Sequence, residues 1–242
     1  MKKALITGAS RGIGRAIAKA LSDDKFEVFI NYVGNDKKAE EAKREIEQAG
    51  GKCTLVKVDL SSPDCAEECY KITGDIDVLI LNASIQCRNK WDSITLDEFD
   101  TQVNCNFRSS FLLIQKYAPY MKNNRWGRIV TIGSVQEKKP HPDMLIYSST
   151  KAALTLMAQS LALNFADSGV TVNSIAPGVI VTDRNADALA SQEYAKQVKD
   201  KIPVGYFGDP ESCAGIVSFL CSDKAHYITG QNIFVDGGMG IK

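Results

Sequence analysis

The sequence predicts a single α/β domain built on a doubly wound parallel sheet of about seven strands, with helices on both faces. Short apolar runs rich in β-branched residues alternate with helical segments along the 242 residues, and this alternation is typical of βαβ units. Most of the runs are almost continuously hydrophobic, as expected of strands buried on both faces. No repeat, low-complexity tract or linker divides the chain, so we expect one domain over residues 1–242.

Seven short runs are expected to form the strands, namely residues 3–7, 27–32, 54–58, 78–81, 128–132, 171–175 and 232–235. After the first run, residues 12–21 place apolar side chains at four-residue steps, which indicates an amphipathic helix. Residues 36–49 are expected to form a second helix that ends at Gly50-Gly51. We interpret the Lys/Glu run at 37–47 as the solvated face of that helix rather than as a partner surface.

Two later helices carry more apolar surface than one sheet can cover. Residues 107–121 and 146–166 place aromatic and aliphatic side chains around more than one helical face. A helix that is buried on two sides needs a second partner besides the sheet. We therefore expect another subunit to cover the second side, so that the chain forms a homo-oligomer, either a dimer or a tetramer.

The composition argues against nucleic acids and membranes as partners. Lys+Arg and Asp+Glu each number 29, so the formal net charge is zero and gives no bulk attraction to polyanions. No apolar run approaches the roughly 18–20 residues of a membrane span. The residues before the first glycine are too few for a signal peptide, and we expect a cytoplasmic protein.

Cysteine usage predicts neither a disulfide framework nor a metal site. The seven cysteines are odd in number and widely spread, and the closest pair, Cys65 and Cys69, has helical spacing. Buried reduced thiols are the simpler interpretation, and no metal is expected.

A glycine-rich loop joins the first strand to the first helix. Residues 7–14 read Thr-Gly-Ala-Ser-Arg-Gly-Ile-Gly, with glycines where a Cβ would block a tight turn or the approach of a pyrophosphate. The N-terminus of the following helix offers free N–H groups and the positive end of its dipole. Three glycines also fit a plain turn, but their place between a strand and an amphipathic helix predicts a Rossmann-like dinucleotide site. The expected coenzyme contacts are Gly8, Ser10, Arg11, Gly12, Ile13 and Gly14.

The end of the second strand indicates which dinucleotide binds. NAD sites carry an acidic residue there, whereas this strand ends in Asn31 and Tyr32, which we expect at the coenzyme. Arg11 in the glycine loop suits a 2′-phosphate, so we predict NADP(H) in preference to NAD(H), with a solvated loop arginine as the alternative. Asp59 ends the third strand and is placed either to accept from an adenine amino group or to cap the helix that begins near residue 62.

A tyrosine and a lysine at helical spacing are the candidate chemical groups. Tyr147 and Lys151 lie one turn apart, and a nearby ammonium lowers the pKa of a phenol by stabilising the phenolate. A phenol with a lowered pKa can give a proton to a carbonyl oxygen and take it back. Such a pair is common by chance, but Ser134 follows the strand at residues 128–132, at the edge where open α/β sheets bind ligands. We expect its hydroxyl to hold the substrate oxygen, with a plain turn serine as the alternative.

Further motifs accompany these residues along the chain. In order, they are the glycine loop at 7–14, Asp59, Asn82-Ala83, Asn106, Ser134, Tyr147 with Lys151, and Pro177-Gly178 followed by Thr182. In this order and spacing the chain resembles the short-chain dehydrogenases/reductases over nearly its full length.

The resemblance implies a catalytic tetrad of Asn106, Ser134, Tyr147 and Lys151. In that tetrad Tyr147 is the general acid/base, and Lys151 lowers its pKa and binds the nicotinamide ribose. Ser134 orients the carbonyl, and Asn106 holds a water molecule in a proton relay. We prefer Asn106 to Asn104 because it lies five residues before Phe111, as in the family.

The resemblance also implies a wider coenzyme surface and a lid. Beyond the glycine loop, the coenzyme contacts are expected to include Leu60, Asn82, Ala83, Ser84, Tyr147, Lys151, Pro177, Gly178, Val179, Ile180 and Thr182. Ser84 stands where the family has a glycine. Residues 183–209 correspond to the family's mobile substrate lid, in which residues 186–201 have a helical pattern.

Polar residues near the expected pocket indicate a small polar substrate. Gln136, His141 and Arg184 are expected to contact it, together with Ser134 and Tyr147. Because a steroid or a long acyl chain would need a mainly apolar lining, these residues favour a sugar, a polyol or a keto acid. The alternative is that most of them face solvent.

Two other functions remain open at this stage. A 3-oxoacyl-[acyl-carrier-protein] reductase shares these motifs, and Lys122, Arg125 and Arg128 are candidates for a basic surface facing the acidic carrier protein. A non-catalytic, coenzyme-binding regulator of the same fold is the third possibility, and the complete tetrad argues against it.

Overall fold

The computed structural model describes the backbone of residues 1–242 and every side chain except those at positions 187 and 188. Its centre is one parallel sheet of seven strands in the order β3-β2-β1-β4-β5-β6-β7. The strands are β1 Lys3–Ile6, β2 Glu27–Tyr32, β3 Cys53–Lys57, β4 Val78–Leu81, β5 Gly127–Ile132, β6 Val170–Pro177 and β7 Asn232–Val235. The doubly wound sheet is confirmed, and every expected strand agrees with an observed one to within two residues at each end.

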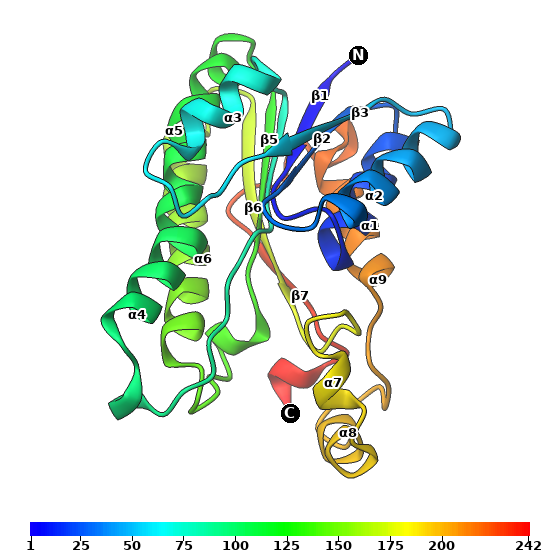
Figure 1. The fold of residues 1–242 in the computed structure, drawn as a ribbon. Helices are drawn as coiled ribbons and strands as arrows, with labels where there is room; N and C mark the ends of the chain where they lie inside the picture. The colour runs from blue at the N-terminus through cyan, green and yellow to red at the C-terminus, as the bar shows by residue number, and fades with distance from the viewer.

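Helices cover both faces of the sheet in two layers (Figure 1). One layer contains α1 Gly12–Asp23, α2 Asp36–Gln48 and α9 Pro210–Cys221, and the other contains α3 Cys65–Thr73, α5 Ser109–Asn123 and α6 Leu145–Phe165. Because strand side chains alternate between faces, Ala4 and Ile6 belong to the core under the first layer and Leu5 to the core under the second. Both faces of the sheet are therefore shielded from water, which explains why the strand sequences are almost continuously hydrophobic.

The segment before α5 differs from the expected single helix over residues 107–121. A helix α4 Leu96–Val103 comes first, and a π-helical turn, Asn104–Arg108, joins it to α5. Helix α4 was not predicted, although Thr95 and Glu98 form a capping box that is readable in the sequence. The π-helical turn carries Asn106, so the departure from regular helix lies at a predicted site residue.

The expected helix over residues 186–201 is instead two short helices, α7 Ala186–Leu189 and α8 Gln192–Lys199. The break lies at Ser191, whose side chain accepts a hydrogen bond from the Tyr194 N–H and so begins α8. This segment returns to the body of the domain at Gly208, which forms a parallel β-bridge with Ile180.

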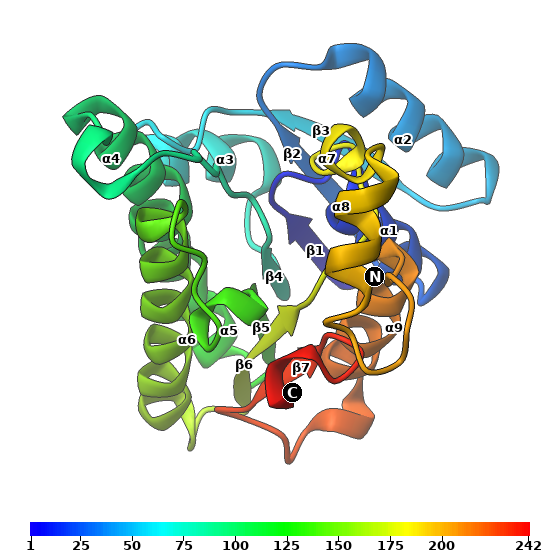
Figure 2. The same cartoon turned by 90° about the horizontal axis from the view of Figure 1, so that it is seen from below.

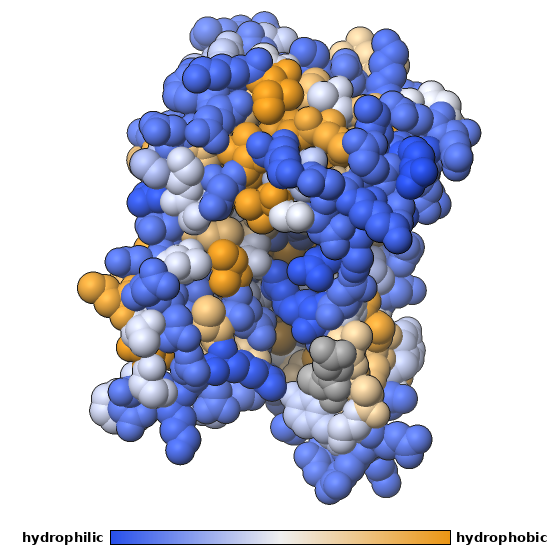
Figure 3. Space-filling view, in the orientation of Figure 1, coloured by the Kyte–Doolittle hydropathy of each residue, from blue (hydrophilic) through white to orange (hydrophobic). Residues whose placement is uncertain are grey.

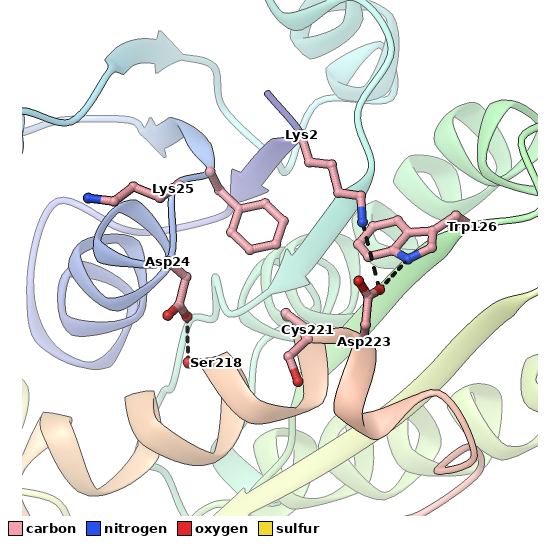
Figure 4. Close-up of a pocket in the computed structure, with 9 residues that line it drawn as sticks. Lys2, Asp24, Lys25, Trp126, Ser218, Cys221 and Asp223 are labelled. Carbon is pink, nitrogen blue, oxygen red and sulfur yellow. Dashed lines mark hydrogen bonds and ion pairs between the residues drawn. The ribbon is translucent and has the colours of Figure 1, made fainter.

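A shallow pocket lies at the amino end of β1 (Figure 4), lined in part by Lys2, Trp126 and Asp223. Asp223 accepts a hydrogen bond of 2.8 Å from the Trp126 indole, and the Lys2 ammonium lies 3.3 Å from the centre of the indole ring. The Arg128 guanidinium stacks 4.4 Å from the same ring and donates to the Gly127 carbonyl at 2.8 Å. Only 3% of the Arg128 side chain is exposed, so the expectation that it offers a basic surface to a carrier protein is wrong.

Exposed apolar side chains lie on α5 and α6, the two helices expected to meet another subunit. Phe111 on α5 and Leu156 and Leu163 on α6 are 44, 64 and 82% exposed. The first side of each helix is buried against the sheet, as Leu113 and Ala158 show. Among the described residues, none of the helices combines the length and apolar character needed to cross a bilayer.

The loops after β1 and β4 are neighbours, because β1 and β4 are paired strands whose chains continue toward opposite faces of the sheet. The buried Thr7 hydroxyl joins the two loops, since it accepts from the N–H groups of Asn82 at 2.8 Å and Ala83 at 2.9 Å. It donates its own proton to the Ile80 carbonyl at 3.2 Å. One hydroxyl thus uses all its hydrogen-bonding capacity to hold the crevice in shape.

Substitution Thr7→Val should destabilise the protein by about 1–4 kcal/mol, because it keeps the side-chain shape and leaves two partly buried N–H groups without an acceptor. Thr7→Ser is the matched control, because it retains the hydroxyl and should cost about 1 kcal/mol for the lost methyl group. Urea unfolding of the three proteins measures both values. Equal losses in the two variants would mean that the hydroxyl does not hold the loops.

Candidate active site

The glycine loop has the backbone that a pyrophosphate site needs. Gly8 and Gly12 adopt positive φ angles of +61° and +56°, which other residues rarely tolerate. A Cβ on Gly14 would lie 2.6 Å from the Asn82 side-chain nitrogen and 2.7 Å from the Gly8 carbonyl oxygen, so α1 approaches the loop too closely for any side chain. Arg11, which precedes α1, has no side-chain acceptor, and the first-turn N–H groups therefore remain available to an anion.

Two predicted coenzyme residues hold this loop from behind. The buried Asn31 side chain accepts from the Gly8 N–H at 3.2 Å and donates to the carbonyls of Val56 and Val58 at 3.1 and 3.0 Å. The Asn82 side chain donates to the carbonyls of Thr7 and Gly8 at 2.8 and 3.0 Å. Both amides therefore hydrogen-bond to the protein backbone, so Asn31 and Asn82 position the loop.

The end of β2 is polar and rich in cations. The Tyr32 hydroxyl donates to Asp36 at 2.9 Å, and Lys57 pairs with the same carboxylate at 2.8 Å. Burial, followed by the Asp36 carboxylate, raises the pKa of Tyr32. Arg11 and Lys38 both contact the Asp183 carboxylate. Sequence reasoning missed Lys38 because it lies within the charged run of α2.

Two other predicted coenzyme residues have local structural roles. Asp59 accepts from the Ser61 N–H at 2.8 Å and from the Ser61 hydroxyl at 2.7 Å. It therefore closes the turn before α3 and does not cap the helix itself, which begins after Asp64. The Leu60 side chain is buried in the core beneath α3 and α5, so the expected coenzyme contact of this residue rests on its backbone.

The four predicted tetrad residues gather at the carboxyl edge of the sheet, and all are more than nine-tenths buried. Ser134 follows β5, and its hydroxyl accepts from the Gln136 N–H at 3.2 Å and lies near enough to Tyr147 on α6 to lower the Tyr147 pKa. The Asn106 amide pairs with both backbone groups of Ile85, at 2.7 and 2.9 Å, and donates to Thr150 at 3.1 Å. Asn104 makes no such contact with α6 among the described side chains, so the choice of Asn106 agrees with the geometry.

The electrostatics of Tyr147 differ from the expectation. Burial raises the pKa of Tyr147, and the nearby Arg184 guanidinium and Ser134 hydroxyl lower it by less. The Lys151 amine donates to the Ile132 carbonyl at 2.6 Å and lies over the Tyr147 ring, 5.6 Å from its centre, whereas Arg184 is the cation that lowers the Tyr147 pKa. Burial also lowers the pKa of Lys151, to about 7. The predicted acidification of Tyr147 by Lys151 is therefore wrong for this arrangement, since burial outweighs it.

The segment after β6 lies against the glycine loop. A Cβ on Gly178 would lie 2.7 Å from the Asp236 Cα, and a Cβ on Gly12 would lie 3.3 Å from the Thr182 methyl group. Thr182 therefore borders the predicted pyrophosphate site. The Val179 carbonyl accepts a hydrogen bond from the Gly208 N–H at 3.0 Å. The Ile180 side chain is buried in the core.

Three predicted substrate contacts, Gln136, His141 and Arg184, lie outside the tetrad, and of these the structure brings only Arg184 close to Tyr147. Its guanidinium also donates to the Ser84 hydroxyl at 3.0 Å and to the Ser84 carbonyl at 2.7 Å. Gln136 is engaged by the Ser148 hydroxyl at 2.9 Å and by Met144. His141 accepts from the Asp143 N–H at 3.1 Å and shapes the turn before α6.

The α7–α8 segment and α6 stand on opposite sides of the carboxyl ends of the strands (Figure 2). The surface is hollowed beside α7, and hydrophilic side chains line much of the hollow (Figure 3). Besides Arg184 and Ser84, a hydrogen bond of 3.4 Å between Arg88 and Tyr194 joins the loop after β4 to α8. Residues 183–209 thus lie over the cleft, where a lid is expected.

The low pKa of Lys151 predicts a dependence of stability on pH. An unfolded lysine titrates near 10.4, so between about pH 7 and 10 the unfolded chain holds a proton at Lys151 that the folded chain has lost. Raising the pH from 7 to 9 should therefore increase the unfolding free energy of the wild type by about 2 kcal/mol relative to Lys151→Met. Parallel urea titrations at both pH values measure the difference, and a difference that does not change with pH would contradict the assignment.

Comparison with known proteins agrees with this site. The family described as Enoyl-(Acyl carrier protein) reductase matches residues 8–240. The chain is 36% identical to Glucose 1-dehydrogenase 2 of Bacillus subtilis, over 98% of this chain and 94% of that protein. It is 39% identical to the 3-oxoacyl-[acyl-carrier-protein] reductase FabG of Staphylococcus aureus, over 98% of both chains.

A solved structure shows the same architecture. The fold superimposes with a TM-score of 0.92 on a putative NAD(P) dependent gluconate 5-dehydrogenase from Beutenbergia cavernae with bound NADP, at 32% identity over 98% of this chain and 96% of that one. The family match, the identities over nearly the whole length and the shared fold all point the same way. The chain therefore belongs to the short-chain dehydrogenase/reductase family of oxidoreductases.

Proposed function

We propose that the protein is an NADP(H)-dependent oxidoreductase that interconverts a carbonyl and a secondary alcohol on a small polar substrate, a sugar, polyol or keto acid. The observation that carries the proposal is the meeting of the Tyr147 hydroxyl with Ser134 and Arg184 in a buried site at the carboxyl edge of the sheet. This site opens beside a glycine loop whose backbone suits a pyrophosphate.

The residues present fit a nicotinamide coenzyme, because the glycines leave no Cβ over the loop and the first turn of α1 offers N–H donors. When bound, the coenzyme supplies or accepts the hydride. Ser134 and Tyr147 hold the substrate oxygen between two hydroxyls. Tyr147 donates its proton to that oxygen during reduction, and a raised pKa ensures that the phenol carries this proton at neutral pH.

Asn106 and Lys151 complete the proposed proton path. Asn106 is fixed by the Ile85 backbone and reaches Thr150, which lies between Tyr147 and Lys151 on α6. Lys151, with a pKa of about 7, is able to gain or lose a proton near neutral pH and so to restore the Tyr147 proton. As in the tetrad that the resemblance implies, the Lys151 amine would also hold the nicotinamide ribose. Thr182 would contact the nicotinamide amide.

The substrate assignment depends on Arg184. A guanidinium at the catalytic phenol suits a carboxylate or several hydroxyls on the substrate, and a long acyl chain gains nothing from it. The relatives include proteins named for glucose and gluconate, which supports the same substrate class. Residues 183–209 are proposed as the lid that carries Arg184 and closes over the substrate.

The second candidate is a 3-oxoacyl-[acyl-carrier-protein] reductase, which the similarity to FabG favours. The basic surface proposed for it does not suit the fold. Arg128 is buried, and Lys122 and Arg125 precede β5, whereas Ser134 follows it, so they lie at the opposite end of the sheet from the tetrad.

We also propose a cytoplasmic homo-oligomer, a dimer or a tetramer. The exposed apolar residues of α5 and α6 provide apolar surface that a contact between subunits would bury. The seven cysteines are free thiols, which suits a reducing compartment.

Turnover by the wild type and Tyr147→Phe tests the function. The panel contains a ketose, a sugar acid, a polyol, a small keto acid and a β-ketoacyl thioester, each with both coenzymes. We expect turnover of a sugar, polyol or keto acid, and a loss of turnover of about 10²–10⁴-fold in Tyr147→Phe, because the proton donor is removed. Turnover of the thioester alone would favour the carrier-protein substrate, and an active Tyr147→Phe would contradict the mechanism.

Coenzyme preference tests the cations at the end of β2. Arg11→Gln and Lys38→Gln should each weaken NADPH binding by about tenfold, because each removes a charge-assisted contact to the 2′-phosphate. NADH, which lacks that phosphate, should bind within about twofold of the wild type. Titration of coenzyme fluorescence measures both dissociation constants, and equal weakening of the two coenzymes would refute the assignment.

A further inference from the structure

Asp183, immediately after Thr182, bridges two cations from different parts of the fold. Its Oδ2 atom lies 3.9 Å from a guanidinium nitrogen of Arg11, at the start of α1, and the Lys38 ammonium of α2 is bonded to the same oxygen. The Lys38 hydrogen bond is the largest of the effects that lower the pKa of Asp183. The three side chains are 57, 37 and 49% exposed for Arg11, Lys38 and Asp183, so a ligand in the cleft has access to them.

Both cations belong to the site proposed above for the 2′-phosphate. Lys57, the last residue of β3, lies beside Tyr32 in the sheet and is paired with Asp36, so its charge is already neutralised. A phosphate monoester carries close to two negative charges and three acceptor oxygens, and it competes strongly with one carboxylate for the same donors. Asp183 and a 2′-phosphate cannot both occupy the space between Arg11 and Lys38 without repelling each other.

Resting on the proposed function, we infer that Asp183 is a coenzyme-specificity residue that competes with the 2′-phosphate of NADP(H) for Arg11 and Lys38. Binding of NADP(H) exchanges the carboxylate for the phosphate, whereas NAD(H) leaves the ion pairs in place. Asp183 thus lowers the preference for NADP(H) that the two cations would otherwise give.

The position of Asp183 links this exchange to the catalytic cleft. Its neighbour Thr182 borders the glycine loop, and its other neighbour, Arg184, contacts Ser84 and Tyr147. Release of Asp183 from the cations therefore frees the first residue of the segment that carries Arg184.

The test compares dissociation constants of NADPH and NADH, measured by coenzyme fluorescence, in the wild type and Asp183→Asn. Removing the competing charge should tighten NADPH binding about three- to tenfold and change NADH binding by less than about twofold. Glu193→Gln is the matched control, because it removes the same charge from the same segment, where Glu193 accepts only from Gln197 among the described side chains. Neither dissociation constant should change in the control by more than about twofold.

Two further results separate the inference from the proposed function. In a Lys38→Gln background, Asp183→Asn should have less than half its effect on NADPH binding, because one of the contested cations is gone. If the wild type binds NADPH no more tightly than NADH, the coenzyme proposal fails. If the wild type prefers NADPH but Asp183→Asn leaves the ratio unchanged or weakens NADPH binding, only the role of Asp183 is overturned. Melting temperatures of both variants confirm that they fold.

Discussion

The crevice between the loops after β1 and β4 is the constraint on which the rest of the structure depends. It exists because the sheet order reverses between these two strands, and the Thr7 hydroxyl holds its two sides together. Asn31 and Asn82 fix the glycine loop from behind through side-chain amides that hydrogen-bond to its backbone and to that of β3. The backbone of the loop is thus preorganised, and the donors facing the crevice are main-chain N–H groups.

The charges around the crevice divide into two groups with different tasks. Arg11 and Lys38 lie at the end of β2 and suit a phosphate, while Arg184 lies at the tetrad and suits the substrate. Asp183 precedes Arg184 in the chain and faces the first group. In the two proposals above, coenzyme choice and substrate contact depend on consecutive residues of one segment.

The catalytic edge is buried enough to change the protonation of its groups. Burial raises the pKa of Tyr147 and lowers that of Lys151 to about 7, so at neutral pH the phenol stays protonated and the amine is able to gain or lose its proton. A simple pair of phenol and ammonium does not describe this site. The phenol keeps its proton, and the cation that lowers its pKa is Arg184, in the segment proposed as a lid.

Much of this arrangement was predictable because its causes are local in the sequence. Continuous apolar runs gave the strands, and the spacing of Gly8, Gly12 and Gly14 gave the loop, since close packing there excludes every other residue. Arg128 was misassigned as a surface cation because its burial depends on which elements pack over it, and that information is not local; the burial of the Leu60 and Ile180 side chains has the same cause. Lys38 and Asp183 were missed for the same reason, since their contact joins residues 145 positions apart.

The most direct test of the account is a crystal structure of the protein with NADPH. We expect the 2′-phosphate between Arg11 and Lys38, with Asp183 displaced, and the nicotinamide ring beside the hydroxyls of Ser134 and Tyr147. A coenzyme bound away from the glycine loop, or a nicotinamide ring out of reach of Tyr147, would contradict it.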